Sequence, residues 1–361
     1  MWEYIPFENC LEKTKIKFKL PKKDYKESGK YPIVSQEQSL ISGYHDDISY
    51  IFKVAKPIVV FGDHTLALKY IDFDFIVGAD GIKILQPVEK INTKYFYYVL
   101  KALIPKTTGY ARHYKLLKKL DIPVPPLAEQ QRIVAKLDAA FADIDRGIKT
   151  TKAKESEISR LNTSILSTTL TEHNHKRVKL GSIATVIAGQ SPKGEYYNKE
   201  GRGTPFYQGK KDYGKRYLNE PKVWTDKVTK LAEKDDILLS VRAPVGALNI
   251  ATQQICIGRG LAAIRPSTKI LNDYLFYSLL LISNKLEGSS GAIFNSINKS
   301  QIEALEVTLP SIEEQQNIVD KLDAALEKIK LTEFSNEAII KNFIKLKSAM
   351  LIQELQSSEA A

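Results

Sequence analysis

The chain has 361 residues, of which 43% are hydrophobic, and it carries a formal net charge of +11. This length exceeds that of one ordinary domain, and the hydrophobic content argues against general disorder. The longest apolar runs, such as residues 279–282, are too short to span a membrane, and the first residues do not resemble a signal peptide. We therefore expect a cytoplasmic protein that does not enter membranes.

The charge is distributed in blocks along the chain. Residues 1–125 carry a net charge of +6 and residues 173–310 carry +8, whereas residues 126–172 are neutral and residues 311–361 carry −3. A basic block attracts polyanions, although a single block is equally well explained by a solvated basic surface. Two equivalent basic blocks favour nucleic acid as the partner.

Residues 1–125 are predicted to form a mixed α/β globule. Apolar runs at 57–61 and 73–77 are each followed by a glycine, which is typical of strands that end in turns. Residues 92–103 (NTKYFYYVLKAL) place apolar side chains at helical spacing, and residues 122–126 (IPVPP) form a rigid extended connector.

A twelve-residue stretch then occurs twice in the chain. Residues 129–140 read EQQRIVAKLDAA and residues 314–325 read EQQNIVDKLDAA, so ten of the twelve positions are identical. After the first copy, an apolar stripe that includes Leu161 predicts one amphipathic helix over about residues 127–168. Gly147 is a position where this helix could fray or bend.

Residues 173–310 loosely repeat the first globule. Segments 204–207, 236–240, 256–258, 272–280 and 305–310 correspond in order to segments 31–34, 57–61, 76–78, 94–103 and 120–125. A second amphipathic helix follows, which begins with a capping box of Ser311 and Glu314 and repeats the apolar stripe, including Leu346. Because each helix must bury its stripe, the two helices are expected to pack on each other in coiled-coil fashion.

The predicted fold class is therefore α+β, with an internal pseudo-two-fold repeat. Two mixed α/β domains, at residues 1–125 and 173–310, are separated by two long, antiparallel, coiled-coil-like helical regions at residues 126–172 and 311–361. Cys10 and Cys256 lie in apolar surroundings, so both are expected to be buried and reduced.

These features resemble the specificity subunit of type I restriction–modification systems. The doubled EQQ-x-IV-x-KLD motif after a proline-rich lead-in carries the resemblance, and residues 236–240 (DILLS), 243–246 (APVG) and 289–297 (SSGAIFNSI) add to it. The resemblance covers essentially the whole chain. The first globule departs somewhat, because residues 61–64 (FGDH) stand where the second has residues 240–243 (SVRA).

The resemblance implies two target-recognition domains, each of which reads one half of a split, asymmetric site in double-stranded DNA. It implies that the helices set the half-site spacing and dock two methyltransferase subunits, to which restriction/translocase subunits are added. S-adenosylmethionine is then expected on the methyltransferase, and ATP and Mg²⁺ on the restriction subunit, with no cofactor on this chain. The rival interpretation is a coiled-coil interaction scaffold whose basic globules bind RNA or protein.

Signatures of catalysis and metal binding are missing from the sequence. It contains neither a G-x-x-x-x-G-K-[ST] phosphate loop nor the Asn-Pro-Pro-aromatic motif of amino-methyltransferases, so we expect a non-catalytic subunit. Asp24 and Lys26 form an isolated D-x-K pattern that we interpret as chance, and Asp63 beside His64 is interpreted as a polar turn or a DNA contact. His173 and His175 lack further ligands at metal spacing, so no metal site is predicted.

DNA contacts are expected from polar and basic side chains on loops between strands, because Arg and Lys pair with guanine or phosphate and Asn and Gln read adenine. The richest loop is residues 207–217 (YQGKKDYGKRY), for which a mobile solvated loop is the alternative. The candidates are Ser35, Gln36, Gln38, His64, Lys69, Arg112, His113 and Lys115 in the first globule, and Lys193, Tyr207, Gln208, Lys210, Lys211, Tyr213, Lys215, Arg216, Arg242, Arg259, Asn295, Asn298 and Lys299 in the second.

Partner contacts are expected from polar residues that both copies of the repeat retain and the apolar stripe does not explain. Helix capping and intrachain ion pairs are the alternative explanation. The candidates are Glu129, Gln130, Gln131, Lys136 and Asp138 in the first copy, and Glu314, Gln315, Gln316, Lys321 and Asp323 in the second.

Overall fold

The computed structural model describes residues 2–79, 81–104, 112–172, 175–243, 245–288 and 296–356, without the side chains of residues 284–288. The chain divides into two compact units, of which unit 1 comprises Met1–Thr151 and Glu337–Ala361 and unit 2 comprises Lys152–Asn336. Each unit therefore holds one globule and a part of each long helix, α3 (Leu127–Thr171) and α6 (Ile312–Gln356).

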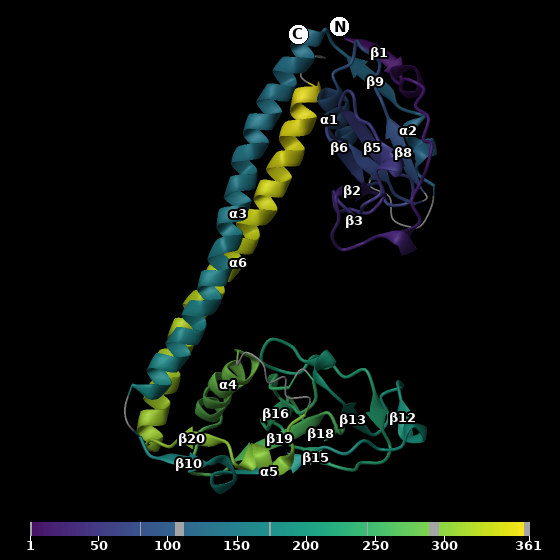
Figure 1. The fold of residues 1–361 in the computed structure, drawn as a ribbon. Helices are drawn as coiled ribbons and strands as arrows, with labels where there is room; N and C mark the ends of the chain where they lie inside the picture. Colours follow the sequence, from purple (N-terminus) through teal and green to yellow (C-terminus); the bar gives the residue numbers. More distant parts are fainter. Residues whose placement is uncertain are drawn as a thin grey trace. The chain divides into compact units, whose positions relative to one another are not determined.

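Among the described residues, the globule of unit 1 contains two larger sheets and one two-stranded sheet, the latter formed by its first and last strands (Figure 1). One has the order β6-β5-β8, from β5 (Ile58–Gly62), β6 (Leu68–Ile71) and β8 (Ile82–Leu85). The other has the order β3-β2-β7-β4, from β2 (Tyr31–Val34), β3 (Gly43–His45), β4 (Ile51–Phe52) and β7 (Phe75–Val77). The remaining elements are β1 (Glu3–Pro6), β9 (Asp121–Val124), α1 (Thr93–Leu103), α2 (Tyr114–Leu117), and the 3-10 helices η1 (Phe7–Cys10), η2 (Lys22–Asp24) and η3 (Ile48–Tyr50).

The described residues of the globule of unit 2 likewise contain two larger sheets and one two-stranded sheet. One has the order β11-β19-β16-β17, from β11 (Ala184–Ala188), β16 (Ile237–Ser240), β17 (Leu248–Ile250) and β19 (Leu261–Pro266). The other has the order β12-β14-β13-β18-β15, from β12 (Tyr197–Asn198), β13 (Thr204–Tyr207), β14 (Trp224–Thr225), β15 (Leu231–Ala232) and β18 (Ile255–Ile257). The remaining elements are β10 (Arg177–Lys179), β20 (Glu306–Thr308), α4 (Asn272–Gly288), α5 (Lys299–Glu303), η4 (Leu180–Ser182), η5 (Gly194–Tyr196) and η6 (Lys210–Asp212).

The two globules share one strand plan. Strand β2 pairs parallel to β7 in unit 1, and β13 pairs parallel to β18 in unit 2. Strand β5 lies between β6 and β8, as β16 lies between β17 and β19. Strand β1 pairs with β9, as β10 pairs with β20. These pairings confirm the repeat of a mixed α/β domain that the sequence predicts.

The two long helices pack together in each unit, in opposite directions. In unit 1, Ile133 and Leu137 near the start of α3 share a core with Leu355 near the end of α6. In unit 2, Leu170 at the end of α3 shares a core with Ile318 near the start of α6. The helices are therefore antiparallel, as predicted, and their apolar stripes are buried by each other and by the globules.

Two expectations about the helices are wrong. Leu161 is 51% exposed and Leu346 is 47% exposed, although the sequence pattern places both in the buried stripe. Leu166 is buried instead, so Leu161 lies away from the centre of the buried face of α3. Helix α3 also continues without a break through Gly147, where an added Cβ would come within 2.7 Å of the Phe343 ring. Gly147 therefore permits a close approach of the two helices and does not bend α3.

Both cysteines are buried and free, as the sequence indicates. Burial raises the pKa of the Cys10 thiol to about 11, which keeps it protonated at neutral pH.

Candidate nucleic-acid interface

In unit 1 the loops after β2, β5 and β7 meet at one end of the sheets. We call this end, formed by residues 35–42, 62–67 and 78–81 without residue 80, the first recognition edge. The Thr65 hydroxyl donates to the carbonyl oxygen of Gln36, and the Gln38 amide donates to the carbonyl oxygen of Thr65 at 2.9 Å. The backbone N–H of His64 donates to the Gln36 side chain at 3.3 Å. Three predicted DNA-binding residues, Gln36, Gln38 and His64, are thus brought together.

Three other candidates of this globule are buried and support the edge from within. The Lys69 ammonium is 5% exposed and donates to the carbonyl oxygen of Ser35 at 2.8 Å. The Ser35 and Ser42 hydroxyls share a hydrogen bond of 2.7 Å. His113 is also 5% exposed, and its backbone N–H donates to the carbonyl oxygen of Asp63 at 2.8 Å. Their burial makes Ser35, Lys69 and His113 internal supports, whereas Arg112 and Lys115 are exposed.

The matching end of unit 2 is the second recognition edge, formed by residues 189–193, 208–209, 241–243 and 258–260. The backbone N–H of Val241 donates to Gly260 at 3.0 Å, and that of Arg259 donates to the Ser191 hydroxyl at 3.2 Å. An added Cβ on Gly260 would collide with the carbonyl oxygen of Gln208, so only glycine permits this approach. Four predicted DNA-binding side chains are exposed on this edge: Lys193, Gln208, Arg242 and Arg259.

Three candidates of the second globule are bonded or packed within it. The Tyr207 hydroxyl is buried and donates to the carbonyl oxygen of Asn219 at 2.7 Å. Burial raises the pKa of Tyr213, whose hydroxyl lies inside the globule. Arg216 forms ion pairs with Asp273 and Asp323 and lies over the ring of Phe276. These three side chains hold the long loop after β13 in place.

The remaining candidates of this globule divide between the loop and α5. Lys210, Lys211 and Lys215 are exposed on the loop. Asn298 caps α5 in a capping box with Gln301, and Lys299 pairs with Glu303 at 3.5 Å, so both have local roles in the helix. Asn295 lies outside the described residues.

A fully buried glutamine occurs in each copy of the repeat. Gln130 accepts from the backbone N–H of Asn92 at 2.7 Å and donates to the carbonyl oxygens of Lys90 (3.0 Å) and Pro125 (2.7 Å). Its neighbours are therefore the connector, the start of α1 and the start of α3. Gln130 is 0% exposed and its amide is fully engaged, so this side chain holds the connector and the two helix starts together.

Gln315 repeats this arrangement in unit 2. It accepts from the backbone N–H of Leu271 at 2.7 Å and donates to the carbonyl oxygens of Lys269 (3.1 Å) and Pro310 (3.0 Å). It too is 0% exposed. We call this three-bond arrangement the glutamine clamp. It explains by folding alone why both copies retain this glutamine, which was predicted to contact a partner and is buried in each unit.

The retained aspartates also face their own globules. Asp138 accepts from the Tyr98 hydroxyl and pairs with Lys94 at 2.7 Å, and Asp323 accepts from the Tyr277 hydroxyl. Burial and the neighbouring carboxylate raise the pKa of Tyr98, and raise that of Tyr277 to about 12. The tyrosines were not predicted, although both occupy the same position in the repeated α1 and α4 segments, which is the signal that would have found them.

The other retained residues are exposed to different degrees. Glu129 pairs with Arg132 at 2.7 Å, and Lys136 pairs with the buried carboxylate of Glu354, which ties α3 to α6 within unit 1. Glu314 accepts from the backbone N–H of Ser311 at 3.2 Å, which confirms the capping box. Six of the ten retained residues are exposed: Gln131, Lys136, Glu314, Gln316, Lys321 and Asp323.

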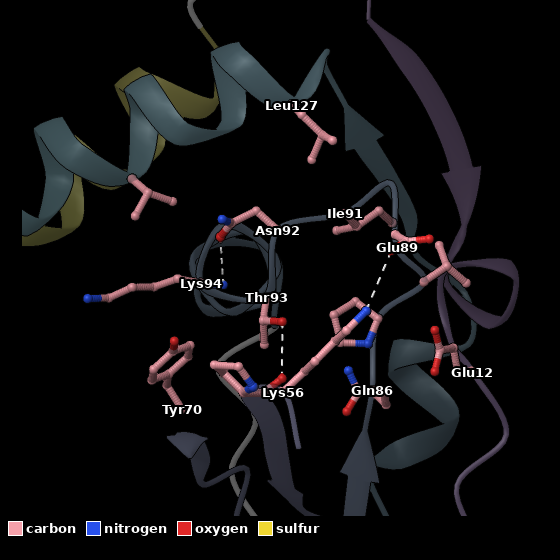
Figure 2. Close-up of a pocket in the computed structure, with 14 residues that line it drawn as sticks. Glu12, Lys56, Tyr70, Gln86, Glu89, Ile91, Asn92, Thr93, Lys94 and Leu127 are labelled. Carbon is pink, nitrogen blue, oxygen red and sulfur yellow. Dashed lines mark hydrogen bonds and ion pairs between the residues drawn. The ribbon is translucent and has the colours of Figure 1, made fainter. Parts of the chain in front are cut away.

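A hollow of about 390 Å³ lies in unit 1 at the opposite end of the strands from the recognition edge (Figure 2). Figure 2 shows Lys56 paired with Glu89 on one side, at 3.6 Å, and Leu127 of α3 above. The Thr93 hydroxyl donates to the carbonyl oxygen of Pro57 at 3.1 Å, and Asn92 caps α1. The polar groups of this hollow are thus largely engaged with one another, and it contains none of the predicted DNA-binding residues.

Two further features bear on function. Within the described ranges, no helix combines the length and the low polarity that a membrane crossing requires. The same residues contain no cluster of three or more His, Cys, Asp or Glu side chains arranged to hold a metal ion.

Comparison with known proteins matches the sequence of this chain to one family. The model of the type I restriction modification DNA specificity domain matches residues 2–159 and 172–341, one match to each half of the repeat. A protein of Methanocaldococcus jannaschii named "Putative type I restriction enzyme MjaX specificity subunit" is 32% identical over 98% of this chain and 94% of that protein. The EcoR124I/EcoR124II specificity subunit of Escherichia coli is 26% identical over 89% of this chain and 86% of that protein.

Solved structures share the fold. A chain from a study of complex assembly and conformational transition of the type I R-M system aligns with a TM-score of 0.79 at 23% identity, over 98% of this chain and 97% of that chain. The HsdS subunit from Thermoanaerobacter tengcongensis aligns with a TM-score of 0.55 at 23% identity, over 98% and 96% of the two chains.

Proposed function

The chain belongs to the type I restriction modification DNA specificity family, and from this membership we propose that it reads one split, asymmetric duplex site through its two recognition edges. It is the specificity subunit, which supplies sequence recognition and leaves the chemistry to its partners. The proposal rests on one observation: the first and second recognition edges lie at matching strand ends of the two units and present different polar side chains.

The asymmetry follows from the chemistry of the two edges. The first edge presents the amides of Gln36 and Gln38, and amides in the major groove pair best with adenine. The second presents Arg242 and Arg259, and guanidinium groups pair best with guanine. We therefore expect the two half-sites to differ, with adenine contacts concentrated in the first and guanine contacts in the second.

The partner methyltransferases dock on the long helices in this proposal. Gln131, Gln316 and Lys321 are exposed there, and Leu331 and Phe334 of α6 are 60% and 71% exposed. Large apolar side chains that stay exposed on a helix are typical of protein contact surfaces. The methyltransferase would carry S-adenosylmethionine and the restriction subunits ATP and Mg²⁺, and the complex would work on DNA in the cytoplasm.

Selection from a random duplex library tests the proposal and requires no assumed target sequence. The full chain, alone and with its methyltransferase, is expected to enrich two short conserved blocks separated by unconserved base pairs. Binding that depends on salt but enriches no sequence would overturn the proposal in favour of a scaffold with a general affinity for nucleic acid.

A further inference from the structure

A row of four lysines lies outside the recognition edges. Lys13, Lys15, Lys17 and Lys19 alternate with Thr14, Ile16 and Phe18, and all four lysine side chains are exposed. Ile16 instead packs against the core of the globule. Alternation with a period of two is what an extended chain produces, because successive side chains then point to opposite sides. The alternation thus puts the four lysines on the solvent side of the segment, away from Ile16.

The row is fixed at both of its ends. The backbone N–H of Glu12 donates to the carbonyl oxygen of Gln86 at 2.8 Å, beyond the end of β8. The backbone N–H of Leu20 donates to the carbonyl oxygen of Val77 at 2.8 Å, immediately before Gly78 of the first recognition edge. The segment therefore runs from the end of β8 to the end of β7 and places Lys19 next to the first recognition edge, which is proposed to read DNA.

Unit 2 uses the corresponding segment differently. The backbone N–H of Gln190 donates to Ile257 at 2.9 Å, as that of Leu20 does to Val77, so the residues before Gln190 correspond to the lysine row. There, β11 (ATVIA) pairs with β19 along its whole length and contains no lysine. The strand plan that the two globules share therefore does not depend on lysines at these positions, which occur in unit 1 and not in β11.

The charges of the row are available to a ligand. None of its four lysines forms an ion pair with any residue in the described part of the chain, whereas the nearby Lys22 and Lys53 pair with Glu37 and Asp74 at 2.7 Å. A hollow of about 260 Å³ opens beside Lys15 and Lys17, and Phe18 stacks on Tyr50 at its wall, with 4.2 Å between the ring centroids.

We propose that the lysine row binds the phosphate backbone of one DNA strand next to the first half-site, as a contact that carries no sequence information. Lysines two residues apart on an extended chain are about 6.6 Å apart, a spacing at which neighbouring lysines can each reach a separate phosphate. The inference rests on the proposed function, because it assumes duplex DNA as the ligand, but it concerns affinity and not the choice of sequence.

Salt-dependent binding of the full chain to a mixed-sequence duplex of about 30 base pairs tests the row. Replacing Lys13, Lys15, Lys17 and Lys19 by Gln is expected to reduce the slope of log K against log salt by about 3 to 4, since each phosphate contact contributes about 0.9. Binding at low salt should weaken at least tenfold. The matching Lys→Arg variant is expected to keep the slope of the unmodified chain.

A second variant controls for total charge. It replaces four exposed lysines of the long helices that lack ion pairs among the described residues, Lys154, Lys328, Lys341 and Lys345. Equal slopes for the lysine-row variant and the unmodified chain, or equal losses in the row and helix variants, would overturn the inference. If the fourfold variant does not fold, K13Q/K15Q and K17Q/K19Q are measured instead, and each should reduce the slope by about 2. The proposed function fails separately, when the unmodified chain selects no split site.

Discussion

Units 1 and 2 have the same strand plan and the same glutamine clamp, yet almost every group they offer to DNA differs. The clamp makes three hydrogen bonds in each unit, from Gln130 and from Gln315, to backbone groups at matching positions. The first recognition edge presents Gln36 and Gln38, whereas the second presents Arg242 and Arg259 together with Lys193 and Gln208. The parts that repeat therefore hold each globule to its helices, and the parts that do not repeat provide specificity.

The largest expected effect comes from breaking one clamp at a time. Gln130→Leu leaves the N–H of Asn92 and two carbonyl oxygens without partners in a buried place, which should cost about 3 kcal/mol of unfolding free energy in unit 1. Gln315→Leu should cost as much in unit 2. Hydrogen exchange at the amides of Asn92 and Leu271 reports each unit separately.

We expect each clamp variant to weaken the hydrogen-exchange protection of the amide in its own unit and to leave the amide of the other unit unchanged. Gln131→Leu, next to the clamp but exposed, is the matched control and should change neither amide. Loss of protection in both units from one substitution would show that the two globules do not fold as separate repeats.

A smaller effect is expected at Gly147 of α3, which lies against Phe343 of α6. Gly147→Ala places a Cβ within 2.7 Å of the Phe343 ring, so it should destabilise unit 1 by about 1 to 2 kcal/mol even though alanine favours helix. The double variant with Phe343→Leu should recover most of this loss. Urea unfolding of the single and double variants measures the coupling, and a stabilising Gly147→Ala would contradict the close approach of α3 and α6.

The last expected effect depends on pH and concerns Lys69, which supports the first edge and has no equivalent in the second. Burial lowers its pKa to about 8 in the folded chain, whereas the unfolded chain keeps the proton up to about pH 10.4. The unfolded state thus binds more protons between these values, and the contribution of Lys69 to stability rises with pH across this window. Urea midpoints from pH 7.5 to 10.5 should show this rise in the unmodified chain relative to Lys69→Met.

The prediction is contradicted if the urea midpoints of Lys69→Met and of the unmodified chain depend on pH in the same way. Lys83→Met is the matched control, because Lys83 lies on the neighbouring strand β8 and is more exposed than Lys69. It should reproduce the profile of the unmodified chain.

The sequence predicts the architecture well because a repeat is a comparison made within one chain. The copies at 129–140 and 314–325 reveal both long helices, and Ser311 with Glu314 marks the start of the second. The corresponding strand runs, such as 57–61 and 236–240, identify β5 and β16. These features depend on local periodicity, which a single sequence records.

The roles of polar residues are harder to predict, because they depend on backbone groups far along the chain. Gln130 donates to the carbonyl oxygens of Lys90 and Pro125, and Lys69 donates to the carbonyl oxygen of Ser35. The residue types around Gln130 and Lys69 in the sequence do not indicate these acceptors. The sequence pattern assigns Arg216 to DNA for the same reason, although Asp273 and Asp323 pair with it. The lysine row is visible as an alternation but becomes informative only beside its uncharged counterpart, β11.

The assignment of each edge to its own half-site is tested most directly by repeating the library selection with one exposed side chain removed from each edge. Gln38→Ala should relax the sequence of one half-site and leave the other half-site and the gap unchanged. Arg259→Ala should do the reverse, with about 1 to 3 kcal/mol of discrimination lost at the affected base pair. Loss of preference in both half-sites from either substitution, or in neither from both, would contradict the account.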